Sequence, residues 1–120
     1  MIKLTFCLIR LPHLTRAEFQ DYWLNHHGPL VASVKDALRI RRYVQTHSVP
    51  AEFSAALRAT RGAPEDYDGV AELWWDSFES MGQDEAATQA SALLLEDEKK
   101  FIDLARSPLW WGREHVIVDQ

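Results

Sequence analysis

The spacing of apolar residues changes along this chain between a period of two and a period of three to four, and the order of the changes limits the possible folds. A period of two predicts a strand, and a period of three to four predicts a helix. The order is strand, helix, strand, strand, helix, strand, which is typical of an α+β domain with one four-stranded antiparallel sheet. A chain of 120 residues has room for one hydrophobic core, so we expect a single domain over residues 1–120.

The start of the first helix carries the clearest local signal. The segment Leu14–Phe19 combines a hydrophobic staple with a capping box, in which Thr15 and Glu18 satisfy each other's backbone N–H groups. This predicts a helix beginning at Thr15. Residues 2–10 alternate between apolar and mixed positions and are expected to form the first strand. Gly28-Pro29 is expected to interrupt the helix, because proline disfavours the α conformation at the residue before it, and helix is expected to resume at Pro29.

The rest of the chain supplies three strands and a second helical region. The expected elements are strands over residues 40–49, 68–75 and 113–119, an excursion with a short helix over 50–66, and helix over most of 77–105. The last strand is placed at 113–119 because Val116-Ile117-Val118 is a run of β-branched residues.

The composition of the chain disfavours some classes of function. The chain has 13 Lys and Arg against 18 Asp and Glu, a net charge of −5, which disfavours binding to nucleic acid or to an anionic membrane surface. The apolar segment 1–10 is too short to span a membrane and lacks the features of a signal peptide. Cys7 is the only cysteine, so no intramolecular disulfide is expected. We expect a cytoplasmic protein.

The order of elements predicts the ferredoxin-like βαββαβ arrangement, with both helices on one face of the sheet and the other face uncovered. Val70, Trp74 and Ile117 would then meet water, so we expect a second copy to cover this face in a homodimer. The dimer would enclose an apolar cavity for a small hydrophobic molecule. With the strand registers assumed here, the side chains facing that cavity are Thr5, Cys7, Tyr43, Gln45, His47, Glu72, Trp74 and His115.

The motif Phe19-x-x-Tyr22-Trp23-x-x-x-His27-Gly28-Pro29-Leu30 resembles the EthD family of the dimeric α/β-barrel superfamily. Three further parts of the chain are also similar to this family: Tyr67–Trp74, Asp97-Glu98 with Phe101–Asp103, and the Val-rich end of the chain. The resemblance implies a ferredoxin-like dimer, often without metal or organic cofactor. It also implies a role in the degradation of ethers and aromatics or in polyketide tailoring. The excursion over 50–66 departs from the family pattern.

His27 is the leading candidate for catalysis. Imidazole titrates near neutral pH and can both give and take a proton, and the expected helix interruption would leave its surroundings irregular. The alternative is that His27 only satisfies backbone groups exposed at the interruption. Spacing does not distinguish it from His26, although the EthD motif selects His27. Glu72 lies mid-strand among apolar residues and is either a second acid–base candidate or an ordinary salt-bridged glutamate.

The substrate-binding candidates are Tyr43, His47, Trp74, Trp23 and His115. The histidines and the tyrosine could bond to a substrate oxygen, and the tryptophans could stack on a flat ring, although Trp23 also has the spacing of a core residue. Two adjacent histidines point apart on a helix, and no His-Glu-x-x-His pattern is present, so we expect no metal and no organic cofactor. Haem ligation by a single histidine stays open.

Three functions stay open on the sequence alone. The first is a cofactor-independent enzyme of lyase, cyclase or isomerase type that moves protons on a small aromatic, polyketide-like or lactone compound. The second is a cofactor-independent monooxygenase or other oxidoreductase of aromatic catabolism. The third is a dimer that binds a small molecule without catalysis.

Overall fold

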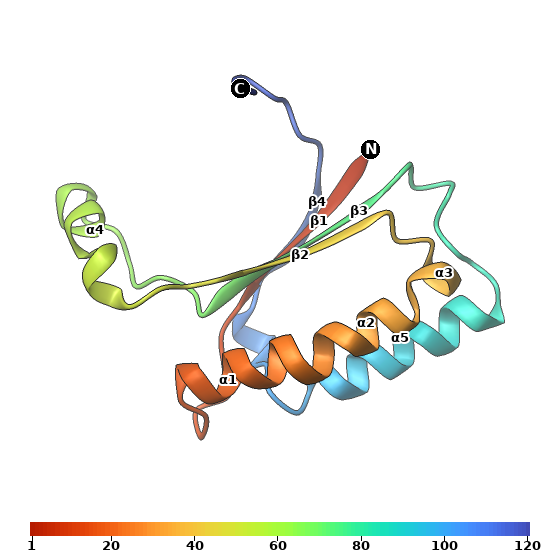
Figure 1. The fold of residues 1–120 in the computed structure, drawn as a ribbon, viewed down its shortest axis with the longest axis horizontal. Helices are drawn as coiled ribbons and strands as arrows, with labels where there is room; N and C mark the ends of the chain where they lie inside the picture. The colour runs from red at the N-terminus through yellow and green to blue at the C-terminus, as the bar shows by residue number, and fades with distance from the viewer.

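The computed structural model describes all 120 residues and shows one sheet with helices on one face (Figure 1). The strands are β1 (Ile2–Leu8), β2 (Arg42–His47), β3 (Gly69–Trp75) and β4 (Leu109–Gly112). The helices are α1 (Arg16–Tyr22), α2 (Gly28–Ser33), α3 (Lys35–Leu38), α4 (Ala55–Arg61) and α5 (Glu85–Glu98). A π-helical turn, Trp23–His27, joins α1 to α2, and 3-10 turns cover Ala51–Phe53 and Leu104–Arg106.

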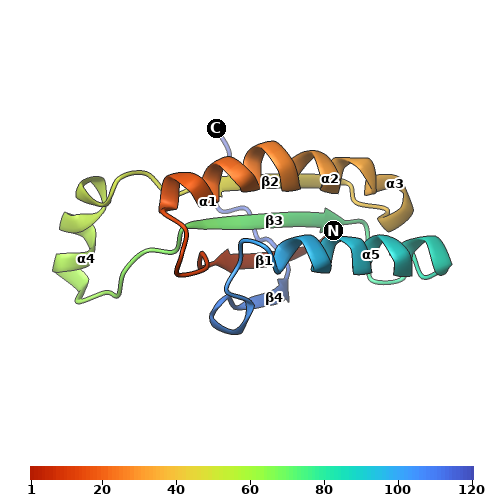
Figure 2. The same ribbon diagram turned by 90° about the horizontal axis from the view of Figure 1, so that it is seen from below.

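The sheet has the order β2-β3-β1-β4, and every pair of neighbours is antiparallel. The helical run α1–α2–α3 lies beside α5 across the same face (Figure 2). This is the ferredoxin-like arrangement, so the fold class predicted from the sequence is confirmed. No helix is long and apolar enough to cross a membrane.

The core lies between the helices and the sheet. Phe6 and Leu8 of β1 point to the helices and are buried in one cluster with Phe19 and Trp23. A Cβ added at Gly69 would overlap the Trp23 ring, so the absence of a side chain there lets the indole lie directly on β3. The predicted inward faces of β1 and β3 are therefore confirmed.

The first helix begins as predicted. The Thr15 hydroxyl accepts a hydrogen bond from the Glu18 N–H at 3.1 Å, and the Glu18 carboxylate accepts one from the Thr15 N–H at 2.9 Å. The predicted interruption at Gly28-Pro29 is wrong. The helical run continues to Ser33, and the Gly28 N–H bonds to the Trp23 carbonyl, five residues back. Pro29 has no N–H to donate, and the chain widens one turn rather than ending the helix.

The prediction of the last strand is also wrong. The strand is Leu109–Gly112, paired with β1, and residues 113–120 leave the sheet on the side away from the helices (Figure 1). Its apolar residues Leu109 and Trp111 pair with Phe6 and Leu4, whose side chains face the core. The β-branched run at 116–118 has strand propensity but no partner in the sheet, so Val116, Ile117 and Val118 are exposed.

The faces of β2 are reversed relative to the prediction. Tyr43 pairs with Leu73 and packs against the core, and Gln45 and His47 reach residues of the helical run. Val44 and Thr46 therefore point to the open face of the sheet. Because side chains alternate along a strand, an error of one residue in the assumed face reverses the whole set.

The excursion between β2 and β3 forms an arm that projects beyond the end of the sheet and carries α4 (Figure 1). The predicted short helix is present as a 3-10 turn followed by α4. Phe53 and Leu57 are exposed on the arm. Asp66 at its base forms ion pairs with Arg16 of α1 and Arg58 of α4, which tie the arm to the domain.

Candidate functional site

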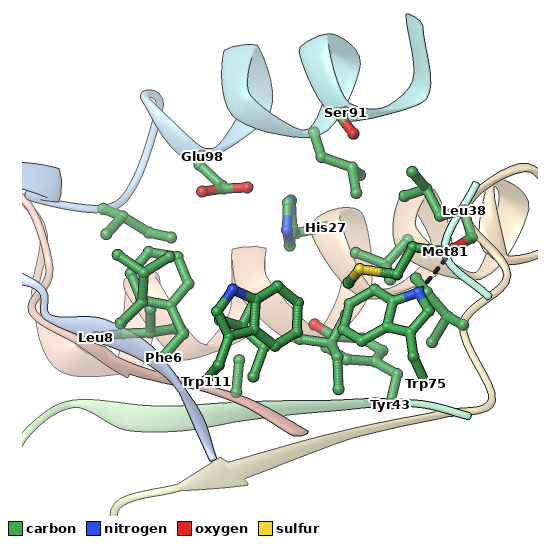
Figure 3. A pocket seen from close by; sticks show the side chains of 18 of the residues that line it. Phe6, Leu8, His27, Leu38, Tyr43, Trp75, Met81, Ser91, Glu98 and Trp111 are labelled. Carbon is green, nitrogen blue, oxygen red and sulfur yellow. Dashed lines mark hydrogen bonds between the residues drawn. The ribbon is translucent and has the colours of Figure 1, made fainter. Parts of the chain in front are cut away.

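A cavity of about 350 Å³ lies between the helices and the helical face of the sheet (Figure 3). Twenty residues line it, and 16 of them are hydrophobic. This cavity lies on the helical face of the sheet. The sequence placed the predicted cavity on the opposite face, between two copies, because that face is left uncovered by the helices, and a cavity between two copies stays a prediction.

The polar side chains in the cavity wall are few and come from different elements. His27 belongs to the π turn, Glu98 and Ser91 to α5, and Tyr43 to β2. Figure 3 shows the His27 ring and the Glu98 carboxyl on the helical side of the cavity, above the aromatic side chains of the sheet. A mainly apolar cavity with a few convergent polar groups is the usual form of a small-molecule site.

His27 is held by a carboxylate on its outer side. Its Nδ1 lies 2.8 Å from Asp97 Oδ2, and both side chains are buried. The Tyr22 hydroxyl donates to the other Asp97 oxygen at 2.6 Å. An ionised Asp97 only accepts hydrogen bonds, so it keeps the neutral imidazole proton on Nδ1. The Nε2 lone pair of His27 is then left on the cavity side.

The π turn and one residue of β2 set the position of His27. The Trp23 carbonyl accepts two hydrogen bonds, one from the Gly28 N–H and one from the Gln45 side-chain amide at 2.9 Å. A Cβ on Gly28 would come within 3.3 Å of that amide. Because Gly28 has no side chain, the Gln45 amide of β2 can reach the widened turn and bond to it directly. Such π turns are frequent at functional sites.

Burial changes the pKa values of the groups around His27. It lowers the pKa of His27 below its usual value, although Asp97 opposes part of this effect, so the ring is neutral at neutral pH. Burial acts to raise the pKa of Asp97, but the hydrogen bonds from Tyr22 and His27 outweigh it and lower that pKa. Burial and the contact with Asp97 raise the pKa of Tyr22 to about 12.

Glu98 is the acidic group that the sequence did not single out as a site residue. Burial, with a smaller contribution from the charge of Asp97, raises its pKa to about 7. Its carboxyl makes no hydrogen bond and no ion pair within the chain. The available signal is its spacing: Glu98 follows Leu94 by four residues and precedes Phe101 and Ile102 by three and four, which is the spacing of one apolar helix face. Glutamate is rarely found on such a face without a partner.

Aromatic side chains form one end of the cavity. Trp75 and Trp111 meet edge to face with 5.4 Å between ring centroids, and Phe78 packs in the same way on Trp111. Trp111 is 43% exposed, which places it at the mouth. The Trp75 N–H donates to the Leu38 carbonyl at 2.7 Å, so this wall is fixed to α3.

Three predicted binding residues lie at or near the cavity. Tyr43 and Trp23 line it, and the Tyr43 hydroxyl accepts a hydrogen bond from Gln45 at 2.7 Å. His47 stacks on Trp23 with 4.5 Å between ring centroids, and its Nε2 bonds to Gln45 at 2.7 Å. His47 therefore supports the cavity wall from behind.

The other predicted site residues lie elsewhere. Glu72 is on the open face, where it forms a 2.7 Å ion pair with Lys3. Trp74 is on the same face and bonds through its N–H to Glu114. His26 is exposed and stacks on Tyr22, and His115 is exposed in the segment after β4. No group of three or more His, Cys, Asp or Glu side chains is placed to hold a metal ion.

The fold and the cavity together define an antiparallel ferredoxin-like α+β domain with an apolar cavity between its helices and its sheet. The EthD domain family matches residues 11–105, and the chain belongs to this family. Among solved structures it is similar to an ethyl tert-butyl ether D (EthD) family protein from Bacillus halodurans C-125. The two share 21% identity over 96% of this chain and 99% of that one, with a TM-score of 0.60. No curated protein matches the chain.

Proposed function

We propose that this protein is an enzyme that transfers protons on a small apolar compound bound in the cavity. One observation carries the proposal: His27 is buried in the wall of an apolar cavity, and Asp97 holds its Nδ1 at 2.8 Å. Histidines that act as general bases commonly have this arrangement, in which a carboxylate orients one ring nitrogen and the other nitrogen has a free lone pair.

The proposed reaction needs only a proton to be removed and returned. His27 Nε2 takes a proton from an acidic carbon of the substrate, and the imidazolium that forms is stabilised by the negative charge of Asp97. The same imidazolium then returns the proton to another atom of the substrate. The apolar walls exclude water and strengthen these electrostatic interactions. An isomerisation, a cyclisation or an elimination could proceed in this way.

The test is deuterium exchange at carbon, which reports proton transfer without requiring the natural substrate. The protein would be incubated in D2O with 2-tetralone and, separately, with α-angelica lactone, and NMR would follow loss of the acidic C–H signals. Wild type should accelerate exchange of at least one compound. His27→Gln should lower the accelerated rate by about 10²–10⁴-fold, the usual contribution of one acid–base group.

His26→Gln is the matched control, because that ring is exposed and stacks on Tyr22 outside the cavity. It should leave the exchange rate within about twofold of wild type. Equal losses in the two variants would exclude the assigned role of His27. If wild type binds aromatic compounds but accelerates no exchange, the chain is a binding protein and the enzyme proposal is wrong.

We further propose that the open face of the sheet pairs with a second copy of the chain. This face presents Val70 and the half-exposed Trp110, and the apolar segment 116–118 leaves the sheet on the same side. Exposed apolar residues on one face of a sheet favour its burial against a second copy, and the Lys3–Glu72 ion pair on the same face would lie within that contact. Light scattering should give twice the subunit mass for wild type and the single mass for Val70→Arg. A monomeric wild type would contradict this pairing.

A further inference from the structure

Glu98 presents a carboxyl group to the cavity without an intramolecular partner. It lies one residue after Asp97 on α5, so the two side chains point to different sides of the helix. Asp97 points to Tyr22 and His27, whereas Glu98 lines the cavity. Figure 3 shows Glu98 and His27 on the same side of the cavity. Glu98 is half-buried and its carboxyl makes no hydrogen bond within the chain, so it is available to bond to a ligand in the cavity.

Building on the proposed function, we infer that Glu98 is a second catalytic residue, donating its proton to the carbonyl oxygen of an uncharged two-ring ketone or lactone while His27 removes the adjacent C–H proton. Three features of the cavity define this substrate class. Its volume of about 350 Å³ is at the small end of ligand sites. Flat aromatic side chains form one end. Two carboxyl groups, Asp97 and Glu98, lie on or behind one wall, which disfavours an anionic substrate.

The reaction is balanced without a further reactant. His27 Nε2 takes the proton from the carbon beside the carbonyl, and the C–H electron pair becomes the new C=C bond. The carbonyl π pair moves to oxygen, which takes the proton of Glu98. The products of this step are the enol, the imidazolium of His27 and the carboxylate of Glu98. When the enol is conjugated with a further C=C bond, the imidazolium gives its proton to the far carbon of that bond, the enol O–H returns its proton to the Glu98 carboxylate, and the C=O bond re-forms. This completes an isomerisation and restores both side chains.

The charged and titratable groups around Glu98 support this protonation state at neutral pH. Asp97 is next to it on α5 and is ionised, His27 on the π turn is neutral, and the Tyr43 hydroxyl on β2 is neutral. None of these groups supplies a positive charge to hold Glu98 as a carboxylate. Burial raises the pKa of Glu98 to about 7, so a large fraction of the protein carries the neutral acid at neutral pH.

Three variants separate the two roles. Glu98→Gln keeps the shape and an N–H donor but cannot transfer a proton, Glu98→Leu removes both functions, and His27→Gln removes the proposed base. The ligand probe is 2-naphthol, which has the shape of the enol of 2-tetralone, with 2-naphthoate as its anionic counterpart. Quenching of the cavity tryptophans would measure binding. Deuterium exchange of 2-tetralone would measure proton transfer.

Wild type should bind 2-naphthol at least tenfold more tightly than 2-naphthoate. Glu98→Gln should keep 2-naphthol affinity within about threefold but lower exchange by tenfold or more, and Glu98→Leu should weaken both. The exchange rate of wild type should fall above pH 7, as Glu98 loses its proton, whereas Glu98→Gln should show no such fall. Circular dichroism would check that the variants fold.

The outcomes distinguish this inference from the proposed function. If exchange requires His27 but proceeds at the wild-type rate in Glu98→Leu, the role of Glu98 is wrong and the proposed function stands. If 2-naphthol binding depends on Glu98 while no variant or wild type exchanges 2-tetralone, Glu98 recognises oxygen but the proposed function fails. If wild type neither binds 2-naphthol nor exchanges 2-tetralone, the assigned substrate class is overturned.

Discussion

The substitution Asp97→Asn tests the contact that defines the site. Asp97 accepts hydrogen bonds from Tyr22 at 2.6 Å and lies 2.8 Å from His27 Nδ1, and it is 8% exposed. Asparagine has the same shape but carries no charge, and its amide can donate to His27 Nδ1. A donor at this position favours the tautomer with the proton on Nε2. The lone pair that faces the cavity would then be lost.

The cost in stability follows from the two hydrogen bonds. Each bond to an ionised carboxylate is worth about 1 kcal/mol more than its neutral equivalent, so the variant should lose about 2 kcal/mol. For a domain of this size, that is a fall in Tm of about 8 °C. Asp36→Asn is the control, because the Asp36 side chain is 93% exposed and pairs only with the exposed Lys35. It should change stability by less than about 0.5 kcal/mol.

The decisive assay is NMR of the imidazole nitrogens across a pH titration, since it does not depend on a substrate. In wild type, the neutral His27 ring should carry its proton on Nδ1. In Asp97→Asn, the proton should move to Nε2, and the pKa of His27 should fall further because the charge that raises it is gone. Unchanged tautomer and pKa in a folded variant would refute the assigned role of Asp97.

Two other substitutions test packing and pH dependence. Gly69→Ala should lower the free energy of unfolding by about 1–3 kcal/mol, because the new Cβ would overlap the Trp23 ring, whereas Gly112→Ala, with no atom within 4 Å of the added Cβ, should be near neutral. Equal urea midpoints for the two variants would contradict the packing. Glu98→Gln should match wild type below pH 4.5 and become more stable than wild type by about 1–2 kcal/mol as the pH rises from 4.5 to 7, because the raised pKa makes ionisation of the half-buried Glu98 costly in the folded state. A constant difference in unfolding free energy between pH 4 and 8 would show that the pKa of Glu98 is not raised in the folded protein.

The elements that the sequence predicted well are those specified by local interactions. The capping box at Thr15 fixes the start of α1 through groups within four residues of one another, so it can be recognised without tertiary information. The faces of β1 and β3 follow from strong alternation. The last strand was misplaced because a β-branched run favours extended backbone but does not choose a partner. Leu109 and Trp111 instead pair with β1 and line the cavity on the helical face of the sheet, which local propensity does not report.

The site was predicted only in part because its geometry depends on contacts between distant segments. His27 was named from the motif, but its orienting partner Asp97 is 70 residues away along the chain. Tyr43 was predicted as a site residue, but the prediction assigned its side chain to the wrong face of β2. What fixes that face is the side chain of Gln45, which bonds to the Trp23 carbonyl of the helical run. No periodicity in the sequence reports such a bond.

The π turn explains why two adjacent histidines that spacing alone could not separate end in different environments. Successive helical residues point about 100° apart, so the two rings face different directions, and the spacing alone does not say which of them faces the core. Gly28-Pro29 removes a donor and a side chain next to His27, and the chain compensates by widening the turn instead of ending the helix. The widened turn, bound by Gln45 from the sheet and by Asp97 from α5, directs His27 inward and leaves His26 in solvent. The feature that suggested an irregular break therefore serves to direct one imidazole into the cavity.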